Sequence, residues 1–121
     1  MKSLAKTIAV AAALVSLAGQ TVASHASAFA AWQVANVPFG DTLNVRKYPS
    51  NSSQKQSAYP NGTVLQMTGK CTGGVDLDYI NGWPAWRQAQ AVRHEWCEAW
   101  VKPPGAPART GWVYGRYIRP L

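Results

Sequence analysis

The chain has 121 residues and a formal charge of +7, a length that limits it to one ordinary domain. Its apolar content of 47% is too high, and its charged content of 14% too low, for an intrinsically disordered protein. Two cysteines exclude a disulfide-dense scaffold, and ten glycines and eight prolines indicate many turns. Six tryptophans and five tyrosines predict an aromatic-rich core or surface.

Residues 1–28 have the organisation of a Sec signal peptide. Two lysines precede the apolar run Ile8–Ala18, and small residues follow it up to Ala28. The run has about 11 residues, whereas a membrane-spanning helix needs about 20, so we expect no transmembrane anchor. Cleavage after Ala28 leaves a single domain, residues 29–121, in the periplasm or outside the cell. Neighbouring small residues leave other cleavage points open: Ala23, Ala26 and Ala30.

The only two cysteines, Cys71 and Cys97, both lie in the mature chain. In an oxidising compartment such a pair predicts a disulfide bond. Closing this loop of 27 residues stabilises a folded domain by about 3.5 kcal/mol in the chain-entropy model. Two free thiols or half of a metal site are the alternatives. A four-ligand zinc site lacks ligands, because one of the two histidines, His25, precedes the predicted cleavage point.

Short β-prone segments between turn residues dominate the mature chain and predict an all-β fold, a small barrel or sandwich. Leu43 and Val45 alternate with polar residues, as on a half-buried strand. In another such segment, Cys97 and Trp96 fall on opposite faces of the predicted strand. The predicted strands are Trp32–Val37, Thr42–Arg46, Thr63–Thr68, Trp96–Val101 and Thr110–Tyr114. The predicted loops are Tyr48–Gly62 and Lys102–Arg109, with a short closing turn at Tyr117–Ile118.

The segment Asp76–Glu95 breaks this rhythm, and residues 84–94 within it predict a helical insertion. Pro84 suits the first position of a helix, and good helix formers follow it. At 100° per residue, three apolar side chains fall on one side and three polar ones on the other. The apolar side is Ala85, Ala89 and Val92; the polar side is Arg87, Gln90 and His94. Since Cys71 and Cys97 flank the insertion, their bond would tie it to the sheet.

Several short motifs occur together in an order that resembles the bacterial SH3-like (SH3b) family. They are Leu43-Asn44-Val45-Arg46 with Pro49-Ser50, Asn61-Gly62-Thr63, Trp96-Cys97-Glu98-Ala99, and Gly111-Trp112-Val113-x-Gly115-x-Tyr117-Ile118. The resemblance covers about residues 32–119. It implies a strongly bent SH3-like barrel of five to six strands that binds peptides, cell-wall glycopeptides or protein partners. The stretch from Gly69 to Trp96 departs from the family, because it is far longer than the usual hairpin.

Basic and aromatic residues near the first and last strands predict a binding surface rather than a catalytic one. The expected ligand-binding residues are Arg46, Tyr48, Trp112, Tyr114 and Arg116. Arginine offers planar donors to carboxylate or phosphate, and aromatic rings offer contact area at low entropic cost. We expect an anionic glycan or peptide of the cell envelope as ligand; the alternative is that the rings are core. Nucleic acid is not expected, because no dense Lys/Arg run occurs.

Evidence for catalysis in the sequence is thin. His94 and Glu95 suggest a dyad, but neighbours on a helix do not face each other, so a solvated histidine is the simpler interpretation. Asp76 and Asp78 have the spacing of a calcium-loop fragment without its other ligands, and a loop turn or helix cap is the better prediction. No phosphate-binding or dinucleotide glycine pattern occurs. The sequence therefore predicts no enzyme, no metal and no cofactor.

The predicted function is that of an exported, monomeric binding module for peptidoglycan, a peptide or an envelope protein. A secreted enzyme inhibitor or effector is the first alternative, with Trp83 and Trp86 of the insertion as a plug. A small hydrolase built around His94 is the weaker one. Exposure of both tryptophans would indicate an interface, and burial of both would indicate a structural role.

Overall fold

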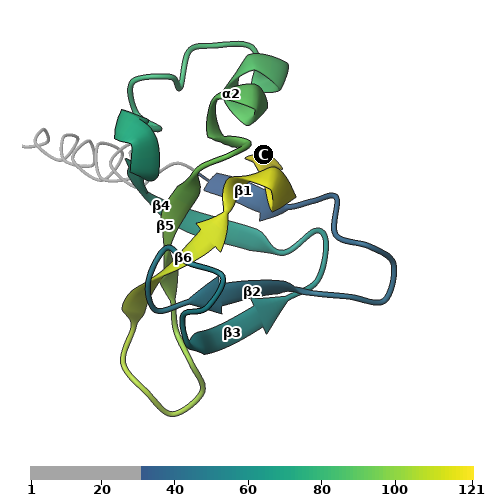
Figure 1. Cartoon of the computed structure of the whole chain (residues 1–121), viewed down its shortest axis with the longest axis vertical. Coiled ribbons are helices and arrows are strands. Elements are labelled where there is room, and N and C mark those ends of the chain that lie inside the picture. Colours follow the sequence, from purple (N-terminus) through teal and green to yellow (C-terminus); the bar gives the residue numbers. More distant parts are fainter. Residues whose placement is uncertain (1–30) are drawn as a thin grey trace, which may run out of the picture.

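A computed structural model describes residues 31–121, and the predicted signal peptide lies outside these residues. The described chain is predominantly β, with one short α-helix (Figure 1). The strands are β1 (Ala31–Val34), β2 (Leu43–Arg46), β3 (Lys55–Tyr59), β4 (Val64–Cys71), β5 (Trp96–Val101), β6 (Arg109–Tyr114) and β7 (Ile118–Pro120). The helical elements are η2 (Thr72–Gly74), α2 (Ala85–Val92) and η3 (Gly115–Tyr117).

The seven strands form one antiparallel sheet in the order β3-β2-β6-β5-β4-β1-β7. The longest ladder joins β5 to β6, from Trp96 opposite Tyr114 to Val101 opposite Arg109. Arg46 of β2 lies opposite Trp112 of β6, so a strand from the start of the domain neighbours one from its end. Figure 1 shows α2 at one end of the molecule and the β2–β3 hairpin toward the other.

The five predicted strands are present, with small shifts at their ends. Residues 31–121 contain seven strands, more than the five to six that the resemblance predicted. One additional strand, β3, lies within the segment Tyr48–Gly62 that we predicted as a loop. Its sequence KQSAY has no apolar alternation, because β3 is an edge strand whose residues are exposed or half-buried. The other, β7, is three residues long and includes a proline, which an edge position tolerates.

A single hydrophobic core lies on one face of the strands. The alternation expected for β4 and β5 is confirmed: Leu65, Met67, Cys97 and Ala99 are buried, while the residues between them are exposed or half-buried. Trp32, only 2% exposed, is the largest side chain in this core. Residues of the insertion and its helix join the same cluster: Leu77, Ile80 and Val92.

The insertion folds as a long loop followed by α2, which is shorter than residues 84–94 because Pro84 and Arg93 are its caps. The predicted inward face is partly wrong: Ala85 is exposed, whereas Gln88 is buried. The amide of Gln88 donates to the carbonyl oxygens of Asn81, at 3.1 Å, and Trp83, at 2.8 Å. A buried amide that satisfies loop carbonyls has a structural role which apolar periodicity does not reveal.

The Cys71–Cys97 disulfide is confirmed, with the sulfur atoms 2.07 Å apart. The two residues lie opposite each other on β4 and β5, at the points where the chain enters and leaves the insertion. Thr72 strengthens the same junction: its Oγ1 donates to Glu95 Oε1 at 2.8 Å and accepts from the backbone nitrogen of Trp96 at 2.9 Å. The insertion is therefore fixed to the sheet at both ends.

Candidate functional site

The face of β5 and β6 that points away from the core carries large aromatic side chains. Trp96 lies opposite Tyr114, and Glu98 lies opposite Trp112. Directly opposed residues of antiparallel strands project on the same face, so these side chains are neighbours. All four are half-buried, while their strand neighbours are buried in the core. Arg46 joins this outer face through its pairing with Trp112.

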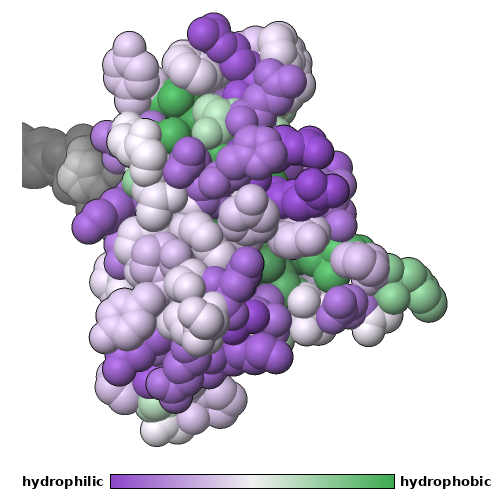
Figure 2. Space-filling view, in the orientation of Figure 1, coloured by the Kyte–Doolittle hydropathy of each residue, from purple (hydrophilic) through white to green (hydrophobic). Residues whose placement is uncertain are grey.

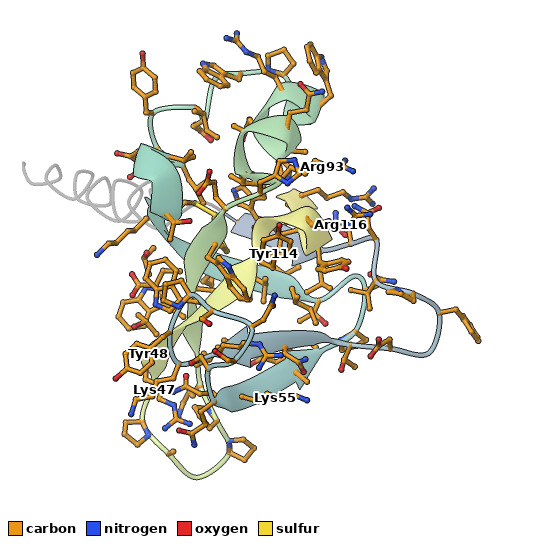
Figure 3. The ribbon with its side chains drawn as sticks, viewed as in Figure 1. Lys47, Tyr48, Lys55, Arg93, Tyr114 and Arg116 are labelled. Atoms are coloured by element: carbon orange, nitrogen blue, oxygen red, sulfur yellow. A yellow bond between two sulfur atoms is a disulfide. The ribbon has the colours of Figure 1, made fainter. Side chains whose placement is uncertain are left out.

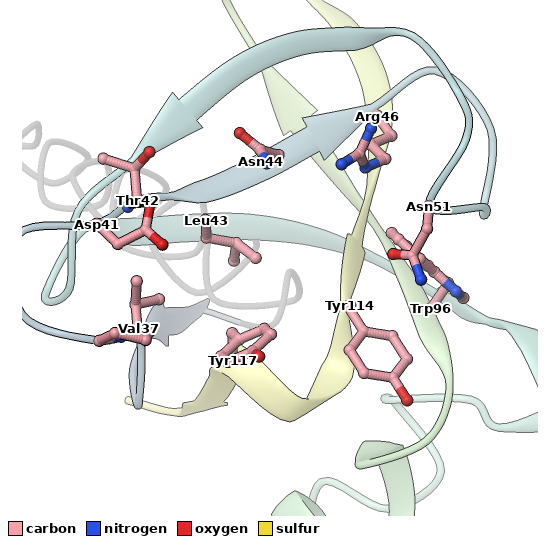
Figure 4. Close-up of a pocket in the computed structure, with 11 residues that line it drawn as sticks. Val37, Asp41, Thr42, Leu43, Asn44, Arg46, Asn51, Trp96, Tyr114 and Tyr117 are labelled. Atoms are coloured by element: carbon pink, nitrogen blue, oxygen red, sulfur yellow. Dashed lines mark hydrogen bonds between the residues drawn. The ribbon is translucent and has the colours of Figure 1, made fainter.

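A hollow of about 220 Å³ opens beside this face, and we call it the Tyr114 hollow. Figure 4 shows Tyr114 and Tyr117 along one wall, with Asn44 and Arg46 of β2 across from them. Its lining residues come from the loop before β2, from β2, from the loop after β2, and from β5, β6 and η3. They are Val37, Pro38, Asp41, Thr42, Leu43, Asn44, Arg46, Asn51, Trp96, Tyr114 and Tyr117.

Three aromatic rings form a continuous row in this hollow. The ring centroids of Trp96 and Tyr114 are 5.2 Å apart with the planes at 53°, and those of Tyr114 and Tyr117 are 6.3 Å apart at 56°. Aromatic pairs at these separations and tilts attract each other beyond their burial energy. The rings therefore stabilise one another's positions in the hollow.

Hydrogen bonds hold the two loops that border the hollow. Arg46 Nη1 donates to the carbonyl oxygen of Ser53 at 2.8 Å, and Ser53 Oγ accepts from the backbone nitrogen of Tyr48 at 2.8 Å. These bonds shape the loop that carries Asn51. On the other side, the side chain of Asn61 exchanges two hydrogen bonds with the backbone of Val37, at 3.0 and 2.9 Å. The walls of the hollow are thus held in place without a ligand.

The polar groups of the Tyr114 hollow suit a neutral or zwitterionic ligand. Its lining has one basic residue, Arg46, and one acidic residue, Asp41, so it has no strong charge of either sign. The amides of Asn44 and Asn51 and the tyrosine hydroxyls both donate and accept hydrogen bonds. Aromatic walls with a few convergent polar groups are typical of sites for small ligands. Sugars and peptides offer the matching hydroxyl and amide groups.

The structure brings together only some of the residues predicted to bind a ligand. Arg46 and Tyr114 line the hollow, and Trp112 lies beside Arg46 on the outer face. Tyr48 is 60% exposed on the adjacent loop, with the Lys47 ammonium 5.6 Å from its ring centroid (Figure 3). Arg116 lies elsewhere, in a second groove beside α2. Arg46 and Arg116 therefore line different hollows.

Of the eleven lining residues, only Arg46 and Tyr114 were predicted to bind a ligand; Asn44, Asn51, Trp96 and Tyr117 are among the nine that were not. The alternation of Trp96 with buried Cys97 was visible and placed the tryptophan on the outer face. Its pairing with Tyr114 follows from the β5–β6 register, which local alternation does not specify. No signal in the sequence marked Asn51, because it lies in a polar loop.

The two tryptophans of the insertion behave differently, so neither expected outcome for the pair holds. Trp83 packs against the core and carries the Arg87 guanidinium 4.0 Å from its ring centroid. Trp86 is 65% exposed, and Tyr79, also in the insertion, is 78% exposed. Figure 2 shows apolar atoms among polar ones over this end of the molecule. Trp83 is therefore structural, while Trp86 is open to a partner.

The groups considered for catalysis or metal binding are placed as follows. His94 is exposed just after α2, and the Glu95 carboxylate accepts the bond from Thr72. Asp76 Oδ1 accepts from the backbone nitrogen of Asp78 at 2.9 Å, which confirms the predicted loop turn. Within residues 31–121, no three His, Cys, Asp or Glu side chains are grouped so as to hold a metal ion. Nor does a helix in this range have the length and apolar character to cross a membrane.

No protein-family model, curated protein or solved structure matches this chain.

Proposed function

We propose that this protein is an exported, non-catalytic binding module that takes a cell-envelope glycan or peptide in the Tyr114 hollow. The observation that carries the proposal is the row of Trp96, Tyr114 and Tyr117 facing the polar groups of Asn44 and Arg46 across one pre-formed hollow. Peptidoglycan combines the sugars and peptides that such a surface suits. Arg46 would then meet a carboxylate of a zwitterionic peptide.

The resemblance to SH3-like domains supports this function. In the structure, the segment Leu43–Arg46 and the segment Gly111–Val113, which carry much of the resemblance, lie on neighbouring strands β2 and β6. The pairing of these strands places Arg46 next to Trp112, and Arg46 also lines the Tyr114 hollow. We propose that the antiparallel sheet is a bent SH3-like barrel elaborated by the disulfide-anchored insertion.

The export part of the proposal predicts a processed protein. The disulfide supports it, because such bonds persist in oxidising compartments. Intact-mass analysis of the protein from the producing cell is expected to show a chain that starts near Phe29 and is two hydrogens lighter than its reduced form. An intact Met1 chain as the only species, or free thiols in freshly isolated protein, contradicts export.

Binding is tested by retention of the processed protein on isolated, insoluble peptidoglycan. The Tyr114→Ala variant is expected to weaken binding by about 2 kcal/mol, roughly thirty-fold, because the central ring of the row is lost. Asn51→Ala, at an exposed loop position, is expected to weaken binding less, through loss of one amide. Trp112→Ala tests whether the contact extends along the outer face.

Tyr79→Ala is the matched control, because it removes a tyrosine that is exposed outside the hollow. It is expected to bind like the unaltered protein. Thermal unfolding of each variant separates a lost contact from a lost fold. If Tyr114→Ala and Asn51→Ala are both folded and both bind normally, the Tyr114 hollow is not the site. If the unaltered protein is not retained at all, peptidoglycan is not the ligand.

An inhibitor or effector that docks on another protein is the second candidate. The exposure of Tyr79 and Trp86 on the insertion favours it, because large aromatic side chains are enriched at the energetic centres of protein interfaces. In that case the partner is captured by the unaltered protein and lost with Trp86→Ala, whereas Tyr114→Ala still captures it.

A further inference from the structure

A second groove, separate from the Tyr114 hollow, lies where α2 meets the C-terminal segment. It has a volume of about 330 Å³ and includes Trp86, Gln90, Arg93, Arg116 and Arg119 in its lining. We call it the arginine groove. The three arginines come from three places in the chain: the end of α2, η3 and β7. Figure 3 shows Arg93 and Arg116 near each other below α2, and Figure 2 shows a strongly hydrophilic surface there.

The backbone beneath the groove is tightly constructed. Helix α2 packs against both η3 and β7. The backbone nitrogen of Gly115 donates to the carbonyl oxygen of Glu95 at 2.7 Å, and that of Ala35 donates to the carbonyl oxygen of Tyr117 at 2.8 Å. A Cβ at position 115 would overlap the carbonyl oxygen of Val92, so only glycine permits this approach. The arginines therefore project from segments held close together.

The charge of the groove is uncompensated by its own lining. Three guanidinium groups line it, and its lining includes no aspartate or glutamate. All three arginines are exposed, so their side chains are accessible to a ligand. Like charges that line one groove disfavour each other, and an anion bound among the three guanidinium groups would offset their charge. The Tyr114 hollow differs, because Asp41 there accompanies its single arginine.

We propose that the arginine groove binds the phosphate group of a phosphorylated sugar, with the sugar ring against Trp86. A phosphate offers three oxygens to several guanidinium forks and up to two negative charges, more than one carboxylate offers. Trp86 lines the same groove and is 65% exposed, which leaves a ring surface next to the anion site. Ala89 beside it adds a small apolar contact, and Gln90 offers an amide to the sugar hydroxyls.

The site is tested by calorimetric titration of the processed protein with glucose 1-phosphate, inorganic phosphate and glucose. Glucose 1-phosphate is expected to bind at least about tenfold tighter than inorganic phosphate, and glucose is expected not to bind. The double variant Arg116→Gln/Arg119→Gln is expected to lose at least about thirtyfold in affinity for both anions. Trp86→Ala is expected to reduce the affinity for glucose 1-phosphate to that for phosphate, with phosphate binding unchanged. A higher salt concentration is expected to weaken the binding of both anions, because it screens their attraction to the arginines.

Arg109→Gln is the matched control, because it removes an exposed arginine outside the groove and is expected to bind normally. Tyr114→Ala alters the other site, the Tyr114 hollow, and is expected to keep phosphate binding. The outcome here is therefore independent of whether the Tyr114 hollow binds an envelope ligand. The proposal is overturned if neither anion binds, if glucose binds as tightly as glucose 1-phosphate, or if the folded double variant keeps its affinity for both anions. Normal binding of glucose 1-phosphate by Trp86→Ala overturns the placement of the sugar.

The phosphorylated sugar can be free or part of a glycolipid headgroup, and flotation with vesicles distinguishes these sources. Phosphatidylcholine vesicles that contain lipid A, a glucosamine disaccharide bisphosphate, are compared with phosphatidylcholine vesicles alone. Flotation with the first only, lost in Arg116→Gln/Arg119→Gln, supports the glycolipid source. Binding of glucose 1-phosphate in the titration, with no flotation with the lipid A vesicles, supports a free sugar phosphate.

Discussion

Reduction of the Cys71–Cys97 bond is expected to lower the free energy of unfolding by about 3.5 kcal/mol, because it opens a loop of 27 residues in the unfolded chain. In a domain of this size such a loss lowers the melting midpoint by roughly 15 °C or more. The bond is not the only interaction that holds the insertion on the sheet, since the insertion also contributes Leu77, Ile80 and Val92 to the core. Thermal unfolding followed by circular dichroism, with and without reductant, measures the effect.

The double variant Cys71→Ala/Cys97→Ala is the control for direct effects of the reductant. Its midpoint is expected to lie near that of the reduced protein and not to respond to reductant. Cys97 is fully buried, so the variant also loses some packing and unfolds slightly below the reduced form. Equal midpoints for the oxidised and reduced unaltered protein would refute a stabilising role for the bond.

The Gly115→Ala variant is expected to lose about 3 kcal/mol of stability, the upper part of the range for overpacking. The added methyl group would overlap the carbonyl oxygen of Val92 and approach that of Glu95. Both are backbone atoms, so no side-chain rotation relieves the contact, and α2 must move away from η3. Chemical denaturation measures the loss, since the midpoint falls while the slope stays constant in a two-state transition.

Gly82→Ala is the matched control, because a Cβ at that position meets no atom within 4 Å. It is expected to change stability by less than about 0.5 kcal/mol. Gly115→Ala also displaces Arg116 relative to Arg93, so it is expected to weaken phosphate binding under conditions where the variant is still folded. A Gly115→Ala protein as stable as Gly82→Ala would show that the helix and η3 are not in close contact.

Local features of the sequence were sufficient to predict much of the secondary structure. The alternation of Leu43 and Val45, and of Cys97 and Ala99, depends only on neighbouring residues, so it identified β2 and β5. The helix was found because Pro84 and the helix formers after it act within a few turns. The disulfide followed from composition, since the chain has only one possible pair. Strand β3 was missed because an edge strand has no apolar pattern to detect.

The arrangement of the candidate sites was decided by tertiary structure alone. Arg46 and Arg116 are both basic and both adjoin predicted strands, yet they line different sites. Arg46 is paired with Trp112 across β2 and β6, whereas η3 turns Arg116 toward α2 after β6 has ended. These placements depend on strand register and helix packing between residues far apart in the chain, which local sequence patterns do not specify. The sequence by itself determined which residues point out of each strand, and packing determined which of them meet.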